Sequence, residues 1–208
     1  MKVDTMMITR LERTNFEKQI RFFIFLKDFI KDPVRIGAIS ESSAVLANAM
    51  INNLMIDSGD SVVELGPGTG VFTRQIRKKT NVYLGIERNP RFTQILKRRF
   101  PSLNFVNGLA EDGFEHHKET GLPPPKAIVC GLPLAIWPND LQDPIISVLD
   151  DLMKPGCIFR TFQYAHSFIL PPAIRFRRKM NELFGPCHRS RVILRNLPPA
   201  FILTWCRE

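Results

Sequence analysis

The sequence has no uninterrupted apolar run near the roughly 20 residues that a membrane-spanning helix needs. Its first residues also lack the apolar stretch of a cleavable signal, so we expect a soluble or peripheral protein. Neither an internal repeat nor a low-complexity tract is present. The 208 residues, 44% of them hydrophobic in short alternating segments, suit one α/β domain with a substantial core.

Cysteine is scarce and scattered. Cys130, Cys157, Cys187 and Cys206 form no C-x-x-C pair, and no histidine spacing indicates zinc. We therefore expect reduced thiols in a cytosolic protein, with no metal site.

Acidic residues are outnumbered, 20 against 29 Lys and Arg, which leaves a net charge of +9. This excess favours an anionic partner, either a nucleic acid or an acidic membrane surface. Charge alone does not choose between the two.

Residues 61–73 are the most informative segment: an apolar strand, a glycine-rich turn and the start of a helix. Gly66, Gly68 and Gly70 allow a sharp turn and a close approach to a ligand. The strand ends near Glu64, and the spacing lacks the G-x-G-x-x-G of dinucleotide sites. The pattern predicts a nucleotide-type cofactor loop, and an ordinary strand-turn-helix with a glycine cap is the simpler alternative.

A second apolar strand, residues 81–87, closes on Glu87, roughly 20 residues after the first strand, where a ribose-binding acid is expected. The two elements together resemble the S-adenosylmethionine site of class I methyltransferases. The resemblance implies a cofactor site that comprises Glu64, Gly66, Pro67, Gly68, Thr69, Gly70, Glu87, Arg88, Ala110, Glu111, Cys130, Gly131 and Leu132. Many relatives carry Gly-Asp-Ala after strand three, whereas Leu109 takes the Asp position here and cannot accept a hydrogen bond from the adenine amine.

Periodicity predicts a Rossmann-like α/β fold with a seven-stranded, mostly parallel sheet and an antiparallel last strand. The expected strands are 61–65, 81–87, 103–106, 126–130, 157–164, 191–194 and 201–205. The expected helices are 44–54, with Ser42 or Ser43 as N-cap, 73–78, 90–100, 141–153 and 173–184.

Residues 10–31 are expected to form one basic amphipathic helix that ends before Asp32-Pro33. Its dense phenylalanines favour insertion in a membrane interface, and packing on its own domain is the alternative. We divide the chain into this docking segment, residues 1–35, and a methyltransferase domain, residues 36–208. The basic cluster from Arg175 to Lys179 is either a second membrane patch or a solvated helix face.

The turn after strand four separates two substrate classes. Methyltransferases that act on adenine in nucleic acid clamp a flipped base with Asn or Asp, then Pro, then an aromatic residue. Here those positions hold Gly131, Pro133 and Leu134. A base therefore lacks its clamp, although the Glu64 loop resembles that of the ribosomal-RNA adenine dimethyltransferases.

Several segments together resemble the bacterial phospholipid N-methyltransferases of the Rhizobium and Agrobacterium type: residues 29–40, 64–73, 130–134, 162–164 and 195–200. The resemblance implies stepwise N-methylation of phosphatidylethanolamine towards phosphatidylcholine at the inner face of the cytoplasmic membrane. It implies anionic lipids as partners and no nucleic acid. An RNA methyltransferase and a catalytically idle membrane- or cofactor-binding module stay open as alternatives.

Methylation of an amine requires that the amine lose its proton, since an alkylammonium has a pKa of about 10.4. Tyr164 and His166, at the end of strand five, are the candidate catalytic residues, with Tyr164 as the first choice, although a tyrosine there can equally be a core residue. For the lipid headgroup, the candidate substrate-binding residues are Arg35, Ser42, Ser43, Pro133 and Arg195, with the arginines placed to bind phosphate.

Overall fold

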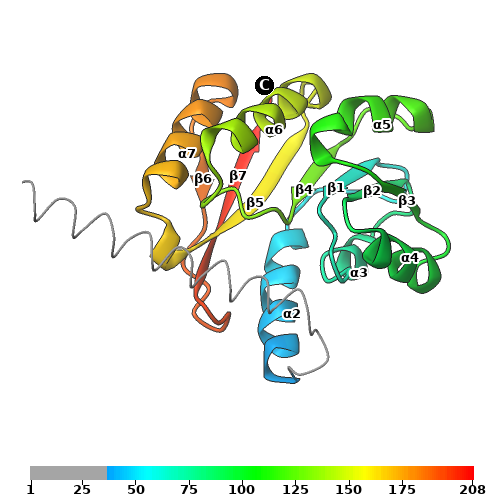
Figure 1. The fold of residues 1–208 in the computed structure, drawn as a ribbon, viewed down its shortest axis with the longest axis horizontal. Helices are drawn as coiled ribbons and strands as arrows, with labels where there is room; N and C mark the ends of the chain where they lie inside the picture. The colour runs from blue at the N-terminus through cyan, green and yellow to red at the C-terminus, as the bar shows by residue number, and fades with distance from the viewer. Residues whose placement is uncertain (1–36) are drawn as a thin grey trace, which may run out of the picture. The chain divides into compact units, whose positions relative to one another are not determined.

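The computed structural model describes residues 37–208, with side chains from Ala44 onward. Its centre is a seven-stranded sheet in the order β3-β2-β1-β4-β5-β7-β6 (Figure 1). The strands are β1 (Val62–Leu65), β2 (Tyr83–Glu87), β3 (Asn104–Asn107), β4 (Ala127–Cys130), β5 (Ile158–Tyr164), β6 (His188–Arg189) and β7 (Ala200–Cys206). Only β7 opposes the other strands, because it pairs antiparallel with both β5 and β6. The predicted α/β fold with a mostly parallel seven-stranded sheet is confirmed.

Helices cover both faces of this sheet (Figure 1). They are α2 (Gly37–Ile51), α3 (Thr73–Ile76), α4 (Pro90–Arg99), α5 (Gly113–Thr120), α6 (Asn139–Leu152) and α7 (Pro171–Phe184). Two short 3-10 helices, η2 (Ala110–Asp112) and η3 (Ala165–Ser167), follow β3 and β5. One buried cluster lies under α6 and α7, and a second lies under α2, α3 and α4.

Every residue of β1, β2 and β4 is buried. Parallel strands covered by helices on both faces need apolar residues at consecutive positions, which is why these segments read as continuous apolar runs. Alternate residues enter opposite clusters, so that Val63 faces α6 while Val62 faces α2 and α4. Glu64, two positions from Val62, therefore points into the second cluster, where a charge is costly.

The start of α2 differs from the expectation. The helix begins at Gly37, so Ser42 and Ser43 lie inside it and the predicted N-cap is wrong. No proline interrupts residues 37–51, and the helix continues through the small hydroxyl residues. Its carboxyl end is held by Arg160, whose guanidinium donates to the carbonyls of Met50 at 3.0 Å and Asn52 at 2.8 Å. A cation stabilises the negative end of a helix.

Two further differences from the expected elements concern β6 and α5. Residues 191–194 are not a strand: β6 is His188–Arg189, and Ile193 makes only an isolated bridge to Ala200. Helix α5 was not expected from the sequence; it has few apolar residues and is followed by Gly121, whose φ is 65°. Such a polar, histidine-rich segment lacks the apolar period that marks a helix.

The basic cluster on α7 is mostly engaged within the domain. The guanidinium of Arg175 and the ammonium of Lys179 both bind the Asp143 carboxylate, at 2.8 Å and 2.9 Å. These partners hold the pKa of Asp143 below its ordinary value. Arg177 lies over the ring of Phe168, 3.7 Å from its centroid. A free membrane patch on this helix would need cations that are not already paired.

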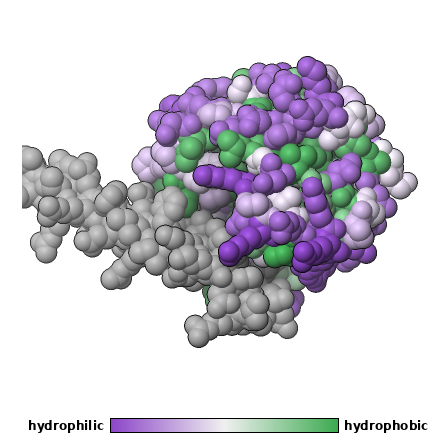
Figure 2. Space-filling view, turned by 45° about the vertical axis from the view of Figure 1, so that its right-hand side comes forward, coloured by the Kyte–Doolittle hydropathy of each residue, from purple (hydrophilic) through white to green (hydrophobic). Residues whose placement is uncertain are grey.

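Hydrophilic residues predominate on the face shown in Figure 2, with hydrophobic residues in a band across its middle. Within residues 37–208, no helix combines the length and apolar character needed to cross a bilayer. The predicted helix at 10–31, Arg35 and the division at residue 35 lie outside the described residues.

Candidate cofactor and methyl-acceptor site

The loop after β1 has the conformation that its glycines predicted. Gly66, Gly68 and Gly70 have φ values of 73°, 56° and 81°. A Cβ at Gly66 would lie 2.6 Å from the side chain of Leu132, and one at Gly70 would lie 2.7 Å from Phe100. A Cβ at Gly68 would have no neighbouring atom within 4 Å. The loop is thus closely packed at its two ends and open at its middle, where a ligand can approach the backbone.

Glu87 ends β2 beside this loop. One of its carboxylate oxygens accepts the Gly68 N–H at 2.9 Å, and the other accepts the Asn89 N–H at 2.8 Å. A carboxylate has about four acceptor positions, so capacity for two ribose hydroxyls is left after these bonds. Arg88, the next residue, is exposed. Glu87 therefore joins the two loops of the predicted site and keeps acceptors for a ligand.

Glu64 is fully buried and does not face solvent. Its Oε2 accepts hydrogen bonds from the hydroxyls of Thr73 at 2.7 Å and Tyr83 at 2.6 Å. Its Oε1 is buried without a partner among the described residues. Burial raises the pKa of Glu64 to about 7, although both hydroxyls lower it. An orphaned buried acceptor at this point suits a cationic or N–H-bearing ligand group.

Sequence reasoning missed the role of Tyr83. It begins β2, and its hydroxyl crosses Gly85 to reach Glu64: a Cβ at Gly85 would lie 2.6 Å from that oxygen. Gly85 pairs directly with Glu64 in the parallel ladder. The available signal was the Tyr-x-Gly spacing opposite a buried acid. This hydroxyl fixes the orientation of the Glu64 carboxyl.

The loop after β3 is tied to the end of β2. The side-chain amide of Asn107 donates to the carbonyls of Glu87 at 2.9 Å and Arg88 at 3.0 Å. Ala110 opens η2, and Glu111 is exposed beside it. Leu109 is 38% exposed. A partly exposed apolar side chain therefore lies at the position where the resemblance to class I methyltransferases implies an adenine-binding acid.

The turn after β4 packs against the first loop. The Gly131 N–H donates to the carbonyl of Leu65 at 2.9 Å, and a Cβ at Gly131 would lie 2.7 Å from the carbonyl oxygen of Gly66. No side chain fits at Gly131 without a backbone shift. Leu132 covers Gly66, and Pro133 follows, partly exposed. This turn therefore packs directly against the cofactor loop.

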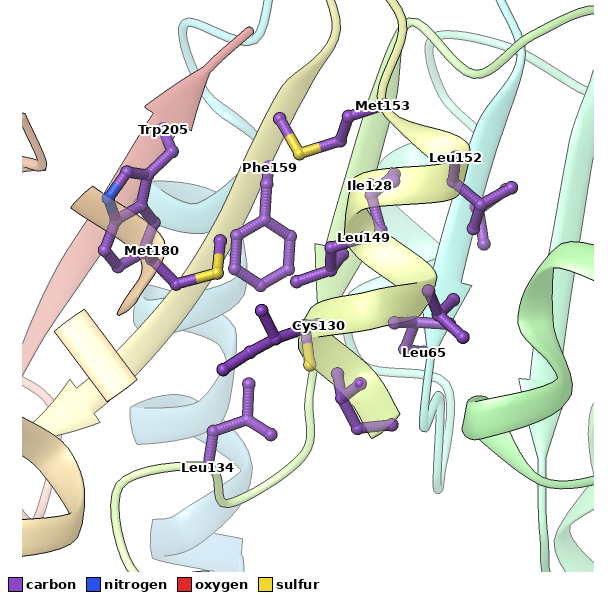
Figure 3. Close-up of a cluster of buried hydrophobic side chains, with 14 of the residues drawn as sticks. Leu65, Ile128, Cys130, Leu134, Leu149, Leu152, Met153, Phe159, Met180 and Trp205 are labelled. Atoms are coloured by element: carbon purple, nitrogen blue, oxygen red, sulfur yellow. The ribbon is translucent and has the colours of Figure 1, made fainter. Parts of the chain in front are cut away.

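Cys130 can offer the site only its backbone. Its thiol is buried in the hydrophobic cluster with Leu134, Leu149 and Phe159 (Figure 3). Burial raises the pKa of this thiol to about 12, so it stays protonated at neutral pH. The geometry therefore excludes a nucleophilic role for the thiol.

Tyr164 and His166 lie together at the end of β5. Their rings stack with centroids 5.7 Å apart and an interplanar angle of 8°. Burial raises the pKa of Tyr164 above 10 and lowers the pKa of His166 below 6.5. At neutral pH both are uncharged, so the imidazole can accept a proton and the phenol can only donate or accept a hydrogen bond. The neighbouring Gln163, which the sequence reading did not single out, is buried and accepts from Arg177 at 2.6 Å.

The sheet topology explains why these segments meet. Strands β1, β2, β3, β4 and β5 are parallel, so their carboxyl ends share one edge, and the chain order reverses between β1 and β4. Arg195, exposed in the connection before β7, belongs to the same edge, because β7 starts where β5 ends. Of the predicted substrate-binding residues, the structure places Pro133 and Arg195 at this edge. Ser42 and Ser43 belong to α2.

Comparison with known proteins agrees with this geometry. A family model described as ribosomal RNA adenine dimethylase matches residues 28–114. An ornithine lipid N-methyltransferase of Singulisphaera acidiphila is 29% identical over 185 residues, which cover 86% of this chain and 92% of that protein.

Solved structures share the fold at low identity. A TehB-like S-adenosylmethionine-dependent methyltransferase from Corynebacterium glutamicum superposes with a TM-score of 0.58 at 12% identity, over 92% of this chain and 99% of that one. The magnesium protoporphyrin IX methyltransferase of Synechocystis, solved with bound S-adenosylmethionine, gives 0.58 at 12% identity, over 86% and 84%.

The residues present fit that cofactor. Gly68 is open to a ligand, Glu87 keeps acceptors for the ribose, and Glu64 has one buried oxygen without a partner among the described residues. The loop geometry, the strand order and the relatives lead to one conclusion: the chain belongs to the class I methyltransferase superfamily, and S-adenosylmethionine is its cofactor.

Proposed function

We propose that the protein N-methylates the amine of a membrane lipid headgroup. Phosphatidylethanolamine, converted stepwise towards phosphatidylcholine, is the substrate that the sequence resemblance implies. The ornithine lipid N-methyltransferase that aligns over 86% of the chain supports the lipid class and makes an ornithine lipid the second candidate substrate. S-adenosylmethionine supplies an electrophilic methyl group on a sulfonium.

The turn after β4 is the observation that carries the choice of a lipid over a nucleic-acid base. A base clamp needs a polar side chain at Gly131, where a Cβ would come within 2.7 Å of the Gly66 carbonyl oxygen. It also needs an aromatic surface at Leu134, which is 1% exposed and packs in the core (Figure 3). The turn therefore offers a flipped base neither a polar side chain for hydrogen bonds nor an aromatic ring for stacking. The ribosomal RNA family match ends at residue 114, before this turn.

His166 is the better candidate for the proton acceptor, and Tyr164 for the group that orients the amine. A base must be unprotonated at working pH, and the lowered pKa of His166 meets that condition. The raised pKa of Tyr164 keeps its proton, so its oxygen contributes a hydrogen bond rather than a charge. The two rings lie nearly parallel at the carboxyl end of β5, with an interplanar angle of 8°.

We propose that Arg195 binds the anionic part of a phospholipid headgroup. It is exposed at the edge that carries the site, and no acidic residue occurs from position 183 to 207. A guanidinium can bind phosphate through two parallel N–H bonds. We place the reaction at the inner face of the cytoplasmic membrane, with the protein bound peripherally.

The test is a methyl-transfer assay with labelled S-adenosylmethionine and three acceptors in parallel: liposomes with phosphatidylethanolamine, liposomes with an ornithine lipid, and unmodified ribosomal RNA. Glu87→Ala serves as a control that removes a cofactor contact. We expect label in the organic phase as methylated headgroups, with the chromatographic position identifying the lipid. Label in RNA alone overturns the proposal. Cofactor binding without label in any acceptor supports an idle binding module instead.

A further inference from the structure

Exposed aliphatic side chains gather in two segments of the described chain. Of the ten large hydrophobic side chains exposed among residues 44–208, five lie in the segments 169–174 and 192–197. Ile169 is 77% exposed and Leu194 is 72% exposed. Large exposed aliphatic groups that cluster mark interaction sites more often than single ones do.

Residues that flank the two segments meet at one end of the sheet, although the segments are about 20 residues apart in the chain. The Ala165 N–H donates to the carbonyl of Pro199 at 2.8 Å, just beyond the pairing of β5 with β7. The guanidinium of Arg189 lies over the rings of Phe168 and Phe201, 5.1 Å and 5.0 Å from their centroids. Figure 1 shows η3 and the connection into β7 at the same end of the sheet. We call residues 165–174 and 188–200 the edge surface.

The edge surface has charge of one sign. It contains no Asp or Glu, whereas Arg189, Arg191 and Arg195 are exposed on it. Aliphatic side chains between arginines complement a bilayer interface, where the former enter the acyl region and the latter meet anionic headgroups. A protein partner would need an acidic surface with apolar pockets, whereas a bilayer offers both features without specific shape.

The position of the edge surface matters for access to the site. It begins directly after Tyr164, at the end of β5, next to the edge that holds the cofactor loop and the turn at Gly131. We propose that the edge surface docks the protein on an anionic lipid bilayer, with Ile169 and Leu194 inserted among the lipids. The proposal rests on the proposed function, since a docked protein could receive the lipid headgroup in its site while the acyl chains stay in the bilayer.

The experiment compares full-length variants by co-sedimentation with vesicles of phosphatidylethanolamine and phosphatidylglycerol. The test variant is Ile169→Ser with Leu194→Ser. The matched control is Met55→Ser, which changes a side chain that is 79% exposed. Met55 lies before the amino end of β1, whereas the edge surface lies at the carboxyl end of β5. Surface substitutions of this kind leave the fold intact, which a thermal melt verifies.

We expect the double variant to partition onto vesicles about 100-fold more weakly, because each of the two inserted aliphatic side chains accounts for about tenfold. Met55→Ser should bind like the wild type. Arg191→Gln should weaken binding about fivefold on anionic vesicles and leave neutral vesicles unaffected. Unchanged partition of the double variant, or an equal loss in Met55→Ser, overturns the proposal. A wild-type dimer that the double variant lacks, seen by sedimentation velocity without vesicles, also overturns it in favour of self-association.

Turnover on detergent-dispersed lipid separates this proposal from the proposed function. If the double variant methylates dispersed lipid at the wild-type rate but binds vesicles weakly, both stand. If the wild type binds vesicles through the edge surface yet methylates no lipid in either form, only the lipid methyltransferase function fails. If the wild type methylates lipid and the double variant still binds vesicles as the wild type does, only the docking proposal fails.

Discussion

Replacing Glu64 by Gln should remove a pH dependence of stability that comes from one buried carboxyl. The native pKa of Glu64 is raised from 4.5 to about 7, chiefly by burial. Between those values the folded protein holds a proton that the unfolded chain has released. Stability therefore falls as pH rises through this window and changes little above it. This is the reverse of an ordinary ion-paired carboxylate.

The size of the effect follows from the shift. One pKa unit corresponds to about 1.4 kcal/mol, so a shift from 4.5 to about 7 amounts to roughly 3 kcal/mol over the whole window. Between pH 5 and pH 8 we expect the wild type to lose about 2 to 3 kcal/mol of unfolding free energy from this group. Glu64→Gln cannot ionise, so its stability relative to the wild type should improve by the same amount over that range.

Urea unfolding of the cofactor-free protein at pH 5 and pH 8 measures the difference directly. Tyr83→Phe is the matched control, because it removes the donor that lies 2.6 Å from Glu64 and lowers its pKa. In that variant the pKa of Glu64 should rise further, and the loss of stability should extend to higher pH. Equal pH dependence in the wild type and Glu64→Gln would refute the reasoning and show that the carboxyl titrates as an exposed group does.

Glu87→Ala should weaken S-adenosylmethionine binding on the order of 100-fold by calorimetry, because the loop loses its 2.9 Å bond at Gly68 and the ribose loses its acceptor; unchanged affinity would contradict the assignment. Gly131→Asn should lower cofactor affinity and melting temperature together, since even its Cβ would lie 2.7 Å from the Gly66 carbonyl oxygen; a wild-type melting curve would show that the turn has room. His166→Gln should lower the maximal rate and abolish its decline at acidic pH while cofactor affinity is retained, and a wild-type pH profile would assign the proton to another acceptor. Deleting residues 1–31 should reduce binding to anionic liposomes more than cofactor binding, and equal co-sedimentation of both forms would place docking in residues 32–208.

The cofactor loop could be predicted because its signals are local. An apolar run and three glycines at fixed spacing indicate a strand and a sharp turn within a few positions, and an acid follows about 20 residues later at the end of the next strand. The structure has the positive φ values at all three glycines and the Glu87 carboxylate on the loop. The repeating strand and helix pattern likewise predicted the parallel sheet.

Errors occurred where local signals are weak or depend on distant partners. The polar helix α5 has almost no apolar period, and residues 191–194 were strand-like in composition but had no neighbouring strand to pair with beyond one bridge. Ser42 and Ser43 are good caps in isolation, yet the helix passes through them. The pairing of Arg175 and Lys179 on α7 could not be predicted, because their partner Asp143 lies on another helix.

The sequence by itself determined the fold class, the cofactor loop and the absence of a base clamp, because these depend on residue types at short spacing. The tertiary structure alone decided what surrounds each of these groups. It showed that Tyr83 reaches Glu64 across Gly85, that Gly131 has no room for a side chain, and that the thiol of Cys130 is in the core. It also brought residues 165–174 and 188–200 to one edge. Burial and pairing arise from segments far apart in the chain, and they set the pKa values and the surfaces on which chemistry depends.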